Sequence, residues 1–160
     1  QNKNYPLFLE IAETIIANRN DVTFIAIGNI MPKYEKIVER FTDNKHSRIK
    51  FLGFRHDVCE LIKNCNIGLL CTYTEGISNA IMELMANGIP VITNDLNGGS
   101  KELISSGEDG IICSNNAMID TLELLLNNDD FCKKLSKNAS DKILNTFSLK
   151  KMVTNYESIY

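Results

Sequence analysis

Two glutamates separated by seven residues, Glu75 and Glu83, are the side chains of this 160-residue chain best placed to do chemistry. Glu75 follows the apolar run 67–70, where a strand is expected to end, and open α/β sheets bind ligands at the carboxyl ends of their strands. Glu83 lies within the otherwise apolar segment 79–86. Because an unpaired buried carboxylate is costly, we expect Glu83 to face a cleft or a ligand hydroxyl.

The segment between the two glutamates is suited to phosphate or sugar oxygens. Gly76 lets the backbone approach a ligand closely, and the amides of Gly76, Ile77 and Ser78 precede a helix expected at 79–86, whose amino end is partly positive. The alternative is an ordinary loop glutamate at Glu75 and a helix glutamate at Glu83 that pairs with a lysine elsewhere.

The whole string 74–92 resembles the signature of the family-4 retaining glycosyltransferases of GT-B fold. In that family, two glutamates separated by seven residues are followed by Gly-x-Pro-Val and then by Gly-Gly-x-x-Glu, which stand here at 88–91 and 98–102. The resemblance covers about 3–160 and only one of the family's two domains. It implies that residues 1–160 are a single C-terminal nucleotide-sugar-binding domain, whose partner is the missing N-terminal acceptor domain of the same parent chain.

The resemblance also implies roles for named residues. Lys3 meets the donor phosphates and Glu75 orients the transferred sugar, which makes them the expected catalytic pair, while Glu83 accepts hydrogen bonds from the ribose hydroxyls. The other donor-binding residues implied in this way are Gly28, Phe54, Arg55, Gly76, Ile77, Ser78, Gly98 and Gly99. The family often has a second glycine where Ile30 stands, which weakens the match at Gly28.

Two of these roles have plain alternatives. Phe54 is expected to lie beside the base and Arg55 to contact it mainly through its main chain, but a core aromatic and a solvated arginine fit the sequence as well. Lys3 opens the first expected helix, as the phosphate-binding lysine of the family does, although a lysine so close to a terminus is usually just solvated.

The reaction implied by the resemblance is transfer of a sugar from a nucleotide diphosphate sugar to an acceptor such as a cell-surface polysaccharide or a lipid-linked glycan, with retention at the anomeric carbon. The chain has no Asp-x-Asp motif to hold a divalent cation, so we expect neither a metal nor a cofactor. The alternatives are a non-catalytic nucleotide-sugar-binding module, another GT-B enzyme such as a sugar-nucleotide epimerase, and an unrelated flavodoxin-like domain.

Composition narrows the partners and the compartment. A net charge of −3 with scattered lysines does not favour nucleic acid or anionic lipid. Apolar runs are too short for a membrane span and no signal peptide opens the chain, so we expect a cytoplasmic protein that reaches the inner face of a membrane only through the missing domain. Five cysteines without a Cys-x-x-Cys pair indicate reduced thiols.

Apolar periodicity predicts strands alternating with helices, and this rhythm indicates a Rossmann-like, doubly wound parallel α/β sheet. The strands are expected at 22–27, 49–52, 67–70, 91–93 and 110–113. The helices are expected at 5–17, 34–41, 58–64, 79–86, 101–105, 119–126, 131–146 and 149–160. By the resemblance, the last helix reaches back toward the other domain.

The family's sheet has six strands in the order 3-2-1-4-5-6, so the resemblance implies that a central first strand is absent from this chain. The strands at 22–27 and 67–70 are then expected to close up, to pair with another chain or to take in further residues, because buried unpaired backbone groups are costly. We therefore expect reduced stability or self-association of the chain, with weak nucleotide binding and no sugar transfer by the chain alone.

Overall fold

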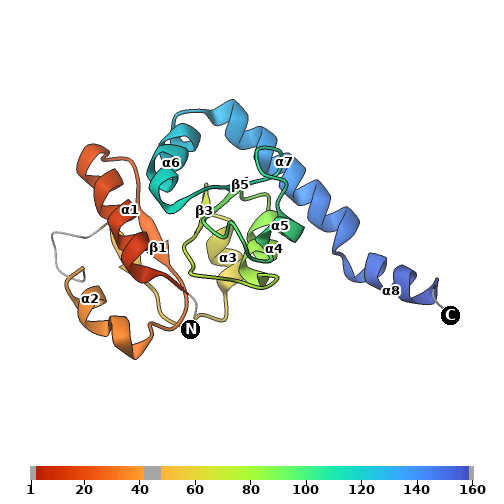
Figure 1. Cartoon of the computed structure of the whole chain (residues 1–160), viewed down its shortest axis with the longest axis horizontal. Helices are drawn as coiled ribbons and strands as arrows, with labels where there is room; N and C mark the ends of the chain where they lie inside the picture. The colour runs from red at the N-terminus through yellow and green to blue at the C-terminus, as the bar shows by residue number, and fades with distance from the viewer. Residues whose placement is uncertain (1–2, 42–47, 159–160) are drawn as a thin grey trace.

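The computed structural model describes residues 3–41 and 48–158, which fold as strands alternating with helices (Figure 1). The elements in chain order are α1 (Tyr5–Asn18), β1 (Phe24–Ala26), η1 (Pro32–Tyr34), α2 (Glu35–Glu39), β2 (Ile49–Phe51), α3 (Val58–Ile62), β3 (Gly68–Leu70), α4 (Asn79–Ala86), β4 (Val91–Thr93), α5 (Ser100–Leu103), β5 (Ile111–Ile112), η3 (Asn115–Ala117), α6 (Met118–Leu126), α7 (Asp129–Thr146) and α8 (Leu149–Glu157). The predicted α/β class is confirmed.

The strands form two separate parallel sheets. One holds β1 and β2, with Phe24 opposite Ile49, and the other has the order β3-β4-β5, with Gly68 opposite Val91. β1 and β3 are therefore edge strands of their sheets. The prediction that the strands at 22–27 and 67–70 close up against each other is wrong. β1 and β3 do not pair, and an apolar cavity separates them.

Helices cover both faces of the larger sheet. Side chains alternate along a strand, and the neighbours Val91 and Ile92 of β4 accordingly belong to different hydrophobic clusters. Ile92 packs with α1 and α6, whereas Val91 packs with α4, α5 and the carboxyl half of α7. The buried helix residues are Leu7, Leu9, Ile11, Ala12, Ile15, Met118, Leu122 and Leu125 on the first face and Ile81, Met85, Leu103, Ala139 and Ile143 on the second. The sheet is doubly wound, as predicted.

Caps fix where several helices begin and end. Asn4 caps α1 by accepting a hydrogen bond of 3.2 Å from the Leu7 amide, and Asn128 caps α7 by accepting one of 3.0 Å from the Phe131 amide. α4 ends before Gly88, whose φ of 69° is in the left-handed region that glycine adopts readily. Asn4, Asn128 and Gly88 thus place these helix ends within one turn of the positions predicted from the sequence.

Some predicted boundaries are wrong. The strand expected at 22–27 is only Phe24–Ala26, because pairing with β2 on one side supports just three residue pairs. The helix expected at 34–41 starts as a 3-10 turn at Pro32 and its α-helical part ends at Glu39. The helix expected at 149–160 is described to Glu157, and residues 159–160 lie outside the described residues.

α8 contributes no buried residue and projects away from the rest of the molecule (Figure 1). Its exposed apolar side chains are Leu149, Met152, Val153 and Tyr156. Within residues 3–41 and 48–158, no helix combines the length and the apolar character needed to cross a membrane.

Candidate functional site

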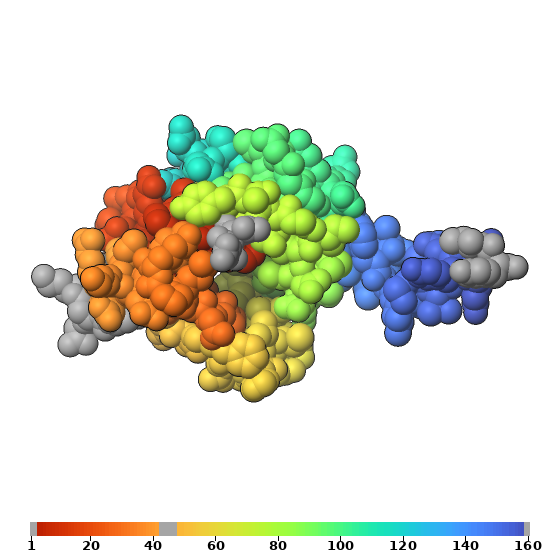
Figure 2. Space-filling view, turned by 60° about the horizontal axis from the view of Figure 1, so that its bottom comes forward, coloured from red at the N-terminus to blue at the C-terminus, as the bar shows by residue number. Residues whose placement is uncertain are grey.

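A cavity of about 420 Å³ lies between the two sheets, and Figure 2 shows the molecule hollowed between the segments after β1, around α3 and around α4. Its inner part, here called the slot, is apolar and is lined by Phe8, Ile25, Ile27, Ile62, Ile67, Leu69 and Leu84. Its outer part, here called the polar mouth, is lined by Lys3, Gly28, Phe54, Arg55 and Glu83. The mouth includes the loops that follow β1 and β2, at the edge where α/β sheets bind ligands.

The two predicted catalytic residues contact each other. The Lys3 ammonium lies 2.6 Å from a Glu75 carboxylate oxygen, and the two side chains are 44% and 20% exposed. The chain is held there because the Asn4 amide donates a hydrogen bond of 3.0 Å to the Cys71 carbonyl, just after β3. A partly exposed pair of this kind is worth about 1 kcal/mol or less, so an incoming anion can compete for Lys3.

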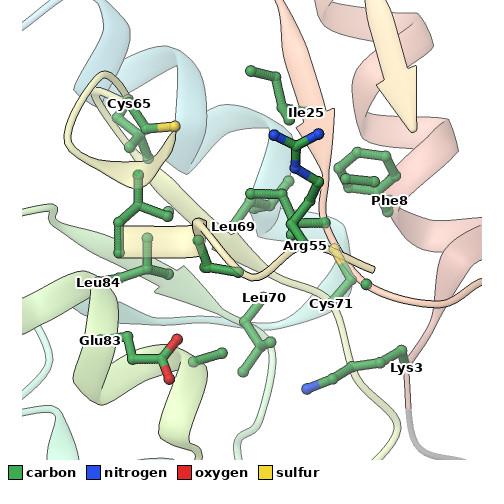
Figure 3. Close-up of a pocket in the computed structure, with 18 of the residues that line it drawn as sticks. Lys3, Phe8, Ile25, Arg55, Cys65, Leu69, Leu70, Cys71, Glu83 and Leu84 are labelled. Carbon is green, nitrogen blue, oxygen red and sulfur yellow. The ribbon is translucent and has the colours of Figure 1, made fainter. Parts of the chain in front are cut away.

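Glu83 faces the same mouth from the other side. Figure 3 shows its carboxylate and the Lys3 ammonium entering the cavity from opposite walls. The apolar residues of segment 79–86 predict a helix that is covered on most sides, and this prediction is wrong. Ala80, Glu83 and Ala86 are exposed, and only the face of α4 that carries Ile81 and Met85 is buried. Glu83 thus faces a cleft, as expected, but as an exposed carboxylate and not as a buried one.

The predicted glycine loops pack on each other beside the mouth. The Gly99 amide donates a hydrogen bond of 2.9 Å to the Glu75 carbonyl, and a Cβ on Gly99 would lie 2.6 Å from the Gly76 carbonyl carbon. Only glycine fits this approach. Gly98 packs against the buried Asp95, which accepts a hydrogen bond of 3.1 Å from the Ser100 amide. The two loops therefore hold Glu75 in place.

The amides between Glu75 and α4 do not line the main cavity. Gly76 and Ile77 are exposed, while Ser78 is buried at the start of α4. Gly98 lines a second, smaller cavity of about 200 Å³ with Thr74, Asn94, Asp95 and Asn115. The structure therefore brings Lys3, Gly28, Phe54, Arg55 and Glu83 together in one cavity and places Gly76, Ile77, Ser78, Gly98 and Gly99 next to it.

The loop after β2 presents an exposed aromatic ring. Phe54 is 63% exposed and packs edge-on against His56 with 4.8 Å between ring centroids, so the core-aromatic alternative is wrong. The Arg55 guanidinium donates hydrogen bonds of 2.8 and 2.6 Å to the Asp57 carboxylate, which lowers the pKa of Asp57. Arg55 is thus held beside Asp57 in a pair whose side chains are both partly exposed.

Gly28 joins this loop to the end of β1. Its φ of 122° lies in the region that favours glycine, and its amide donates a hydrogen bond of 2.8 Å to the Gly53 carbonyl. The backbone after β1 is therefore turned beside Phe54, and both residues reach the polar mouth.

Asn94, which no sequence motif singled out, ties the carboxyl ends of β3 and β4 together. Its side chain accepts a hydrogen bond of 2.8 Å from the Thr72 amide and donates one of 2.7 Å to the Thr72 carbonyl. It also donates one of 2.6 Å to the Asn115 side chain. The available signal was a polar pair, Asn94-Asp95, directly after a buried strand.

The cysteines and acidic residues give the described chain no metal centre. Across residues 3–41 and 48–158, no group of three or more His, Cys, Asp or Glu side chains is arranged to hold a metal ion. All five cysteines are free thiols. Burial raises the pKa of the Cys71 thiol to about 12, so Cys71 is a neutral side chain at physiological pH.

The family model of the glycosyl transferases group 1 matches residues 1–128, most of the chain. The chain belongs to this family. A curated relative from Escherichia coli, a UDP-Gal:alpha-D-GlcNAc-diphosphoundecaprenol alpha-1,3-galactosyltransferase, is 29% identical over 99% of the chain and 42% of its own length. The chain spans about two fifths of the length of the curated relatives it matches first.

Solved structures share the fold of this chain. The C-terminal domain of the group 1 protein LpcC from Francisella tularensis superposes with a TM-score of 0.80 at 21% identity, over 92% of this chain and 80% of that one. HepE from Anabaena, solved with UDP and glucose, gives a TM-score of 0.79 at 21% identity, over 94% and 43% of the two chains. The relatives from Escherichia coli and Campylobacter jejuni are named as transferases, so the epimerase alternative is not favoured.

Proposed function

We propose that this chain is the donor-binding domain of a retaining glycosyltransferase that moves a sugar from a nucleotide diphosphate sugar to an acceptor, without a metal ion or a cofactor. The observation that carries the proposal is the meeting of the Lys3–Glu75 ion pair and the Glu83 carboxylate across one polar mouth, between two parallel sheets. A cation and a hydroxyl acceptor that line one cavity suit the diphosphate and the ribose of one nucleotide.

Each residue has a distinct part in this proposal. Departure of the nucleotide diphosphate develops negative charge, which the Lys3 ammonium and the amides near Gly76 stabilise electrostatically. Glu83 accepts the ribose hydroxyls and the exposed Phe54 ring stacks on the base. Glu75, which the contact with Gly99 fixes in place, orients the transferred sugar.

The names of similar proteins suggest a donor and an acceptor class. The Escherichia coli relative is named for a UDP-sugar donor and a diphosphoundecaprenol acceptor, and HepE is solved with UDP. We therefore take UDP as the first nucleotide to test and a lipid-linked glycan or a cell-surface polysaccharide as the acceptor class. We further propose a cytoplasmic site of action, with acceptor binding and any membrane attachment supplied by a second domain of the same polypeptide.

Calorimetric titration of the chain with UDP, GDP, ADP and uridine tests the proposal. We expect saturable binding of at least one nucleoside diphosphate. Uridine should bind much more weakly, because it has no phosphate group to contact the Lys3 ammonium. Lys3→Ala should weaken diphosphate binding by about tenfold, the effect of about 1.4 kcal/mol. Lys63→Ala, which breaks a comparable exposed ion pair with Glu60 outside the cavity, is the matched control. Diphosphate binding no tighter than uridine binding would contradict the proposal.

A further inference from the structure

A second cavity, here called the cup, opens at the carboxyl ends of β3, β4 and β5, the edge at which α/β sheets bind ligands. It has a volume of about 200 Å³ and is lined by segments 72–74 and 94–98 together with Asn4 and Asn115. Asn4 lines the main cavity as well. Lys3 and Glu75, which form the ion pair, each stand next to a cup residue in the chain. The cup therefore lies beside this pair and next to the polar mouth.

Hydrogen bonds between the three loops fix the shape of the cup. The Asn94 side chain accepts a hydrogen bond of 2.8 Å from the Thr72 amide and donates one of 2.7 Å to the Thr72 carbonyl. It donates a third, of 2.6 Å, to the Asn115 side-chain oxygen. Asp95 is only 4% exposed, and one of its carboxylate oxygens accepts a hydrogen bond of 3.1 Å from the Ser100 amide. The cup is therefore formed before any ligand binds, as small-molecule sites usually are.

Three side chains of the cup keep hydrogen-bonding groups to spare. The Asn115 oxygen accepts from Asn94, but its NH2 group has no partner within residues 3–41 and 48–158. In the same part of the chain, the Asn97 side chain and the second carboxylate oxygen of Asp95 have no partner either. A side-chain amide donates and accepts, and a carboxylate accepts. The cup can therefore bind groups that do both, as a hydroxyl group does.

The cup differs from the polar mouth in charge. Lys3 and Arg55 line the mouth, whereas no Lys, Arg or His among the described residues lines the cup. A phosphate or carboxylate ligand would bring its charge beside Asp95 without a cation to pair with, so the cup does not suit an anion. Tyr73 and Leu96, which are 62% and 42% exposed, add apolar surface to the polar lining. Neutral hydroxyl groups on a ring with an apolar face fit this combination.

We propose that the cup binds one neutral pyranose ring, with Asp95, Asn97 and Asn115 bonded to its hydroxyl groups and Tyr73 packed on its C–H face. Pockets for drug-sized ligands start at roughly 300 Å³, so about 200 Å³ suits a single ring. The ring belongs either to the donor nucleotide sugar or to a separate glycan, and in both cases the cup holds it beside Glu75. Its assignment to a transferase substrate rests on the proposed function, whereas ring binding by the cup does not require a nucleotide in the mouth.

NMR titration of the isotope-labelled chain tests the proposal. The probes are the methyl α-glycosides of glucose, galactose, N-acetylglucosamine and N-acetylgalactosamine, then UDP, and then the UDP-sugars of the same four rings. Sorbitol, an open-chain polyol, is the control ligand. The amide groups of Tyr73, Asn97 and Asn115 report on the cup, and those of Gly28 and Phe54 report on the mouth.

Two variants sharpen the titration. Asn97→Ala removes a free amide from the cup and breaks no hydrogen bond of that side chain within the described residues. Asn116→Ala is the matched control, because Asn116 is also exposed, adjoins Asn115 and does not line the cup. Asn97→Ala should weaken binding of the ring by about fivefold, the effect of one hydrogen bond, and Asn116→Ala should leave the affinity unchanged.

We expect saturable shifts of the cup resonances with at least one ring and none with sorbitol. Shifts with a methyl glycoside alone assign the ring to a separate glycan, and shifts with a UDP-sugar beyond those with UDP assign it to the donor. No shift with any of these probes, equal shifts with sorbitol, or equal affinities of Asn97→Ala and the natural chain would overturn the proposal. Failure of the proposed function has a different signature, since UDP would then leave Gly28 and Phe54 unshifted whatever the glycosides do at the cup.

Discussion

At the scale of single residues, the charged side chains of the Lys3–Glu75 pair are partly exposed, whereas the Cys71 thiol is buried. Lys3 and Glu75 keep contact with solvent, so their pair is weak enough to open for a ligand. Cys71, only a few residues away on the end of β3, is buried and has a pKa of about 12.

The Cys71 thiol should make the fold less stable in alkali. The pKa of this thiol is higher in the folded state than in the unfolded chain. Its contribution to the free energy of unfolding is therefore complete below about pH 8.5 and is lost as the pH rises toward 12. Between pH 8 and pH 10 we expect the free energy of unfolding of the natural chain to fall by about 1.5 kcal/mol more than that of Cys71→Ala. Urea denaturation at both pH values measures this. Cys59→Ala, at an exposed cysteine, should follow the natural chain, and parallel pH profiles for all three would refute the assignment.

At the scale of elements, the contact between the loops 75–78 and 98–99 is the clearest positioning device. Gly99→Ala should lower the free energy of unfolding by about 1–3 kcal/mol, because its Cβ would lie 2.6 Å from the Gly76 backbone. Gly76→Ala is the matched control, since a Cβ there meets nothing within 4 Å, and its stability should change by less than about 0.5 kcal/mol. Denaturant titration compares the two variants, and equal losses would show that the contact does not decide the packing.

The order of the elements was predictable because short apolar runs mark the strands and capping residues mark the ends of the helices. The runs at 67–70 and 91–93 became β3 and β4, and Gly88 ends the helix between them as expected. Their exact lengths were not predictable, because β1 depends on how many residues of β2 pair with it.

For the candidate site, the string 74–92 identified Glu75 and Glu83 but not their environments. The helix that carries Glu83 was expected to be covered on most sides because its residues are apolar, yet packing against α7 and the sheet covers only one side of α4. The role of Asn94 was also hidden, since it arises from contacts between residues 22 positions apart. Sequence patterns report local preference, and these features depend on tertiary contacts.

At the scale of the whole molecule, the proposed donor site lies in a cavity that is open to solvent (Figure 2). The chain spans about two fifths of the length of its curated relatives. Holding an acceptor hydroxyl against the anomeric carbon can lower a barrier by roughly 7 to 11 kcal/mol, and a single sugar subsite does not fix an acceptor hydroxyl in that position. The chain alone should therefore bind nucleotide but transfer no sugar.

Incubation of the purified chain with UDP-sugars, followed by assay of released UDP and of glycosylated product, measures this expectation. We expect binding in calorimetry and product at background level. Turnover by the chain alone, at a rate typical of a complete transferase, would show that the second domain is not needed for the chemistry.

The most direct measurement of the central claim is the affinity of Glu83 variants for UDP, or for whichever nucleoside diphosphate binds most tightly, by isothermal titration calorimetry. Glu83→Ala should weaken binding by about tenfold, because the ribose hydroxyls lose a charged acceptor worth roughly 1.4 kcal/mol or more, and Glu83→Gln should lose less. Glu10→Ala, at an exposed helical glutamate of α1 outside the cavity, should leave the affinity unchanged. Unchanged affinity in Glu83→Ala together with a large loss of stability would show that Glu83 supports the fold and does not bind the ribose.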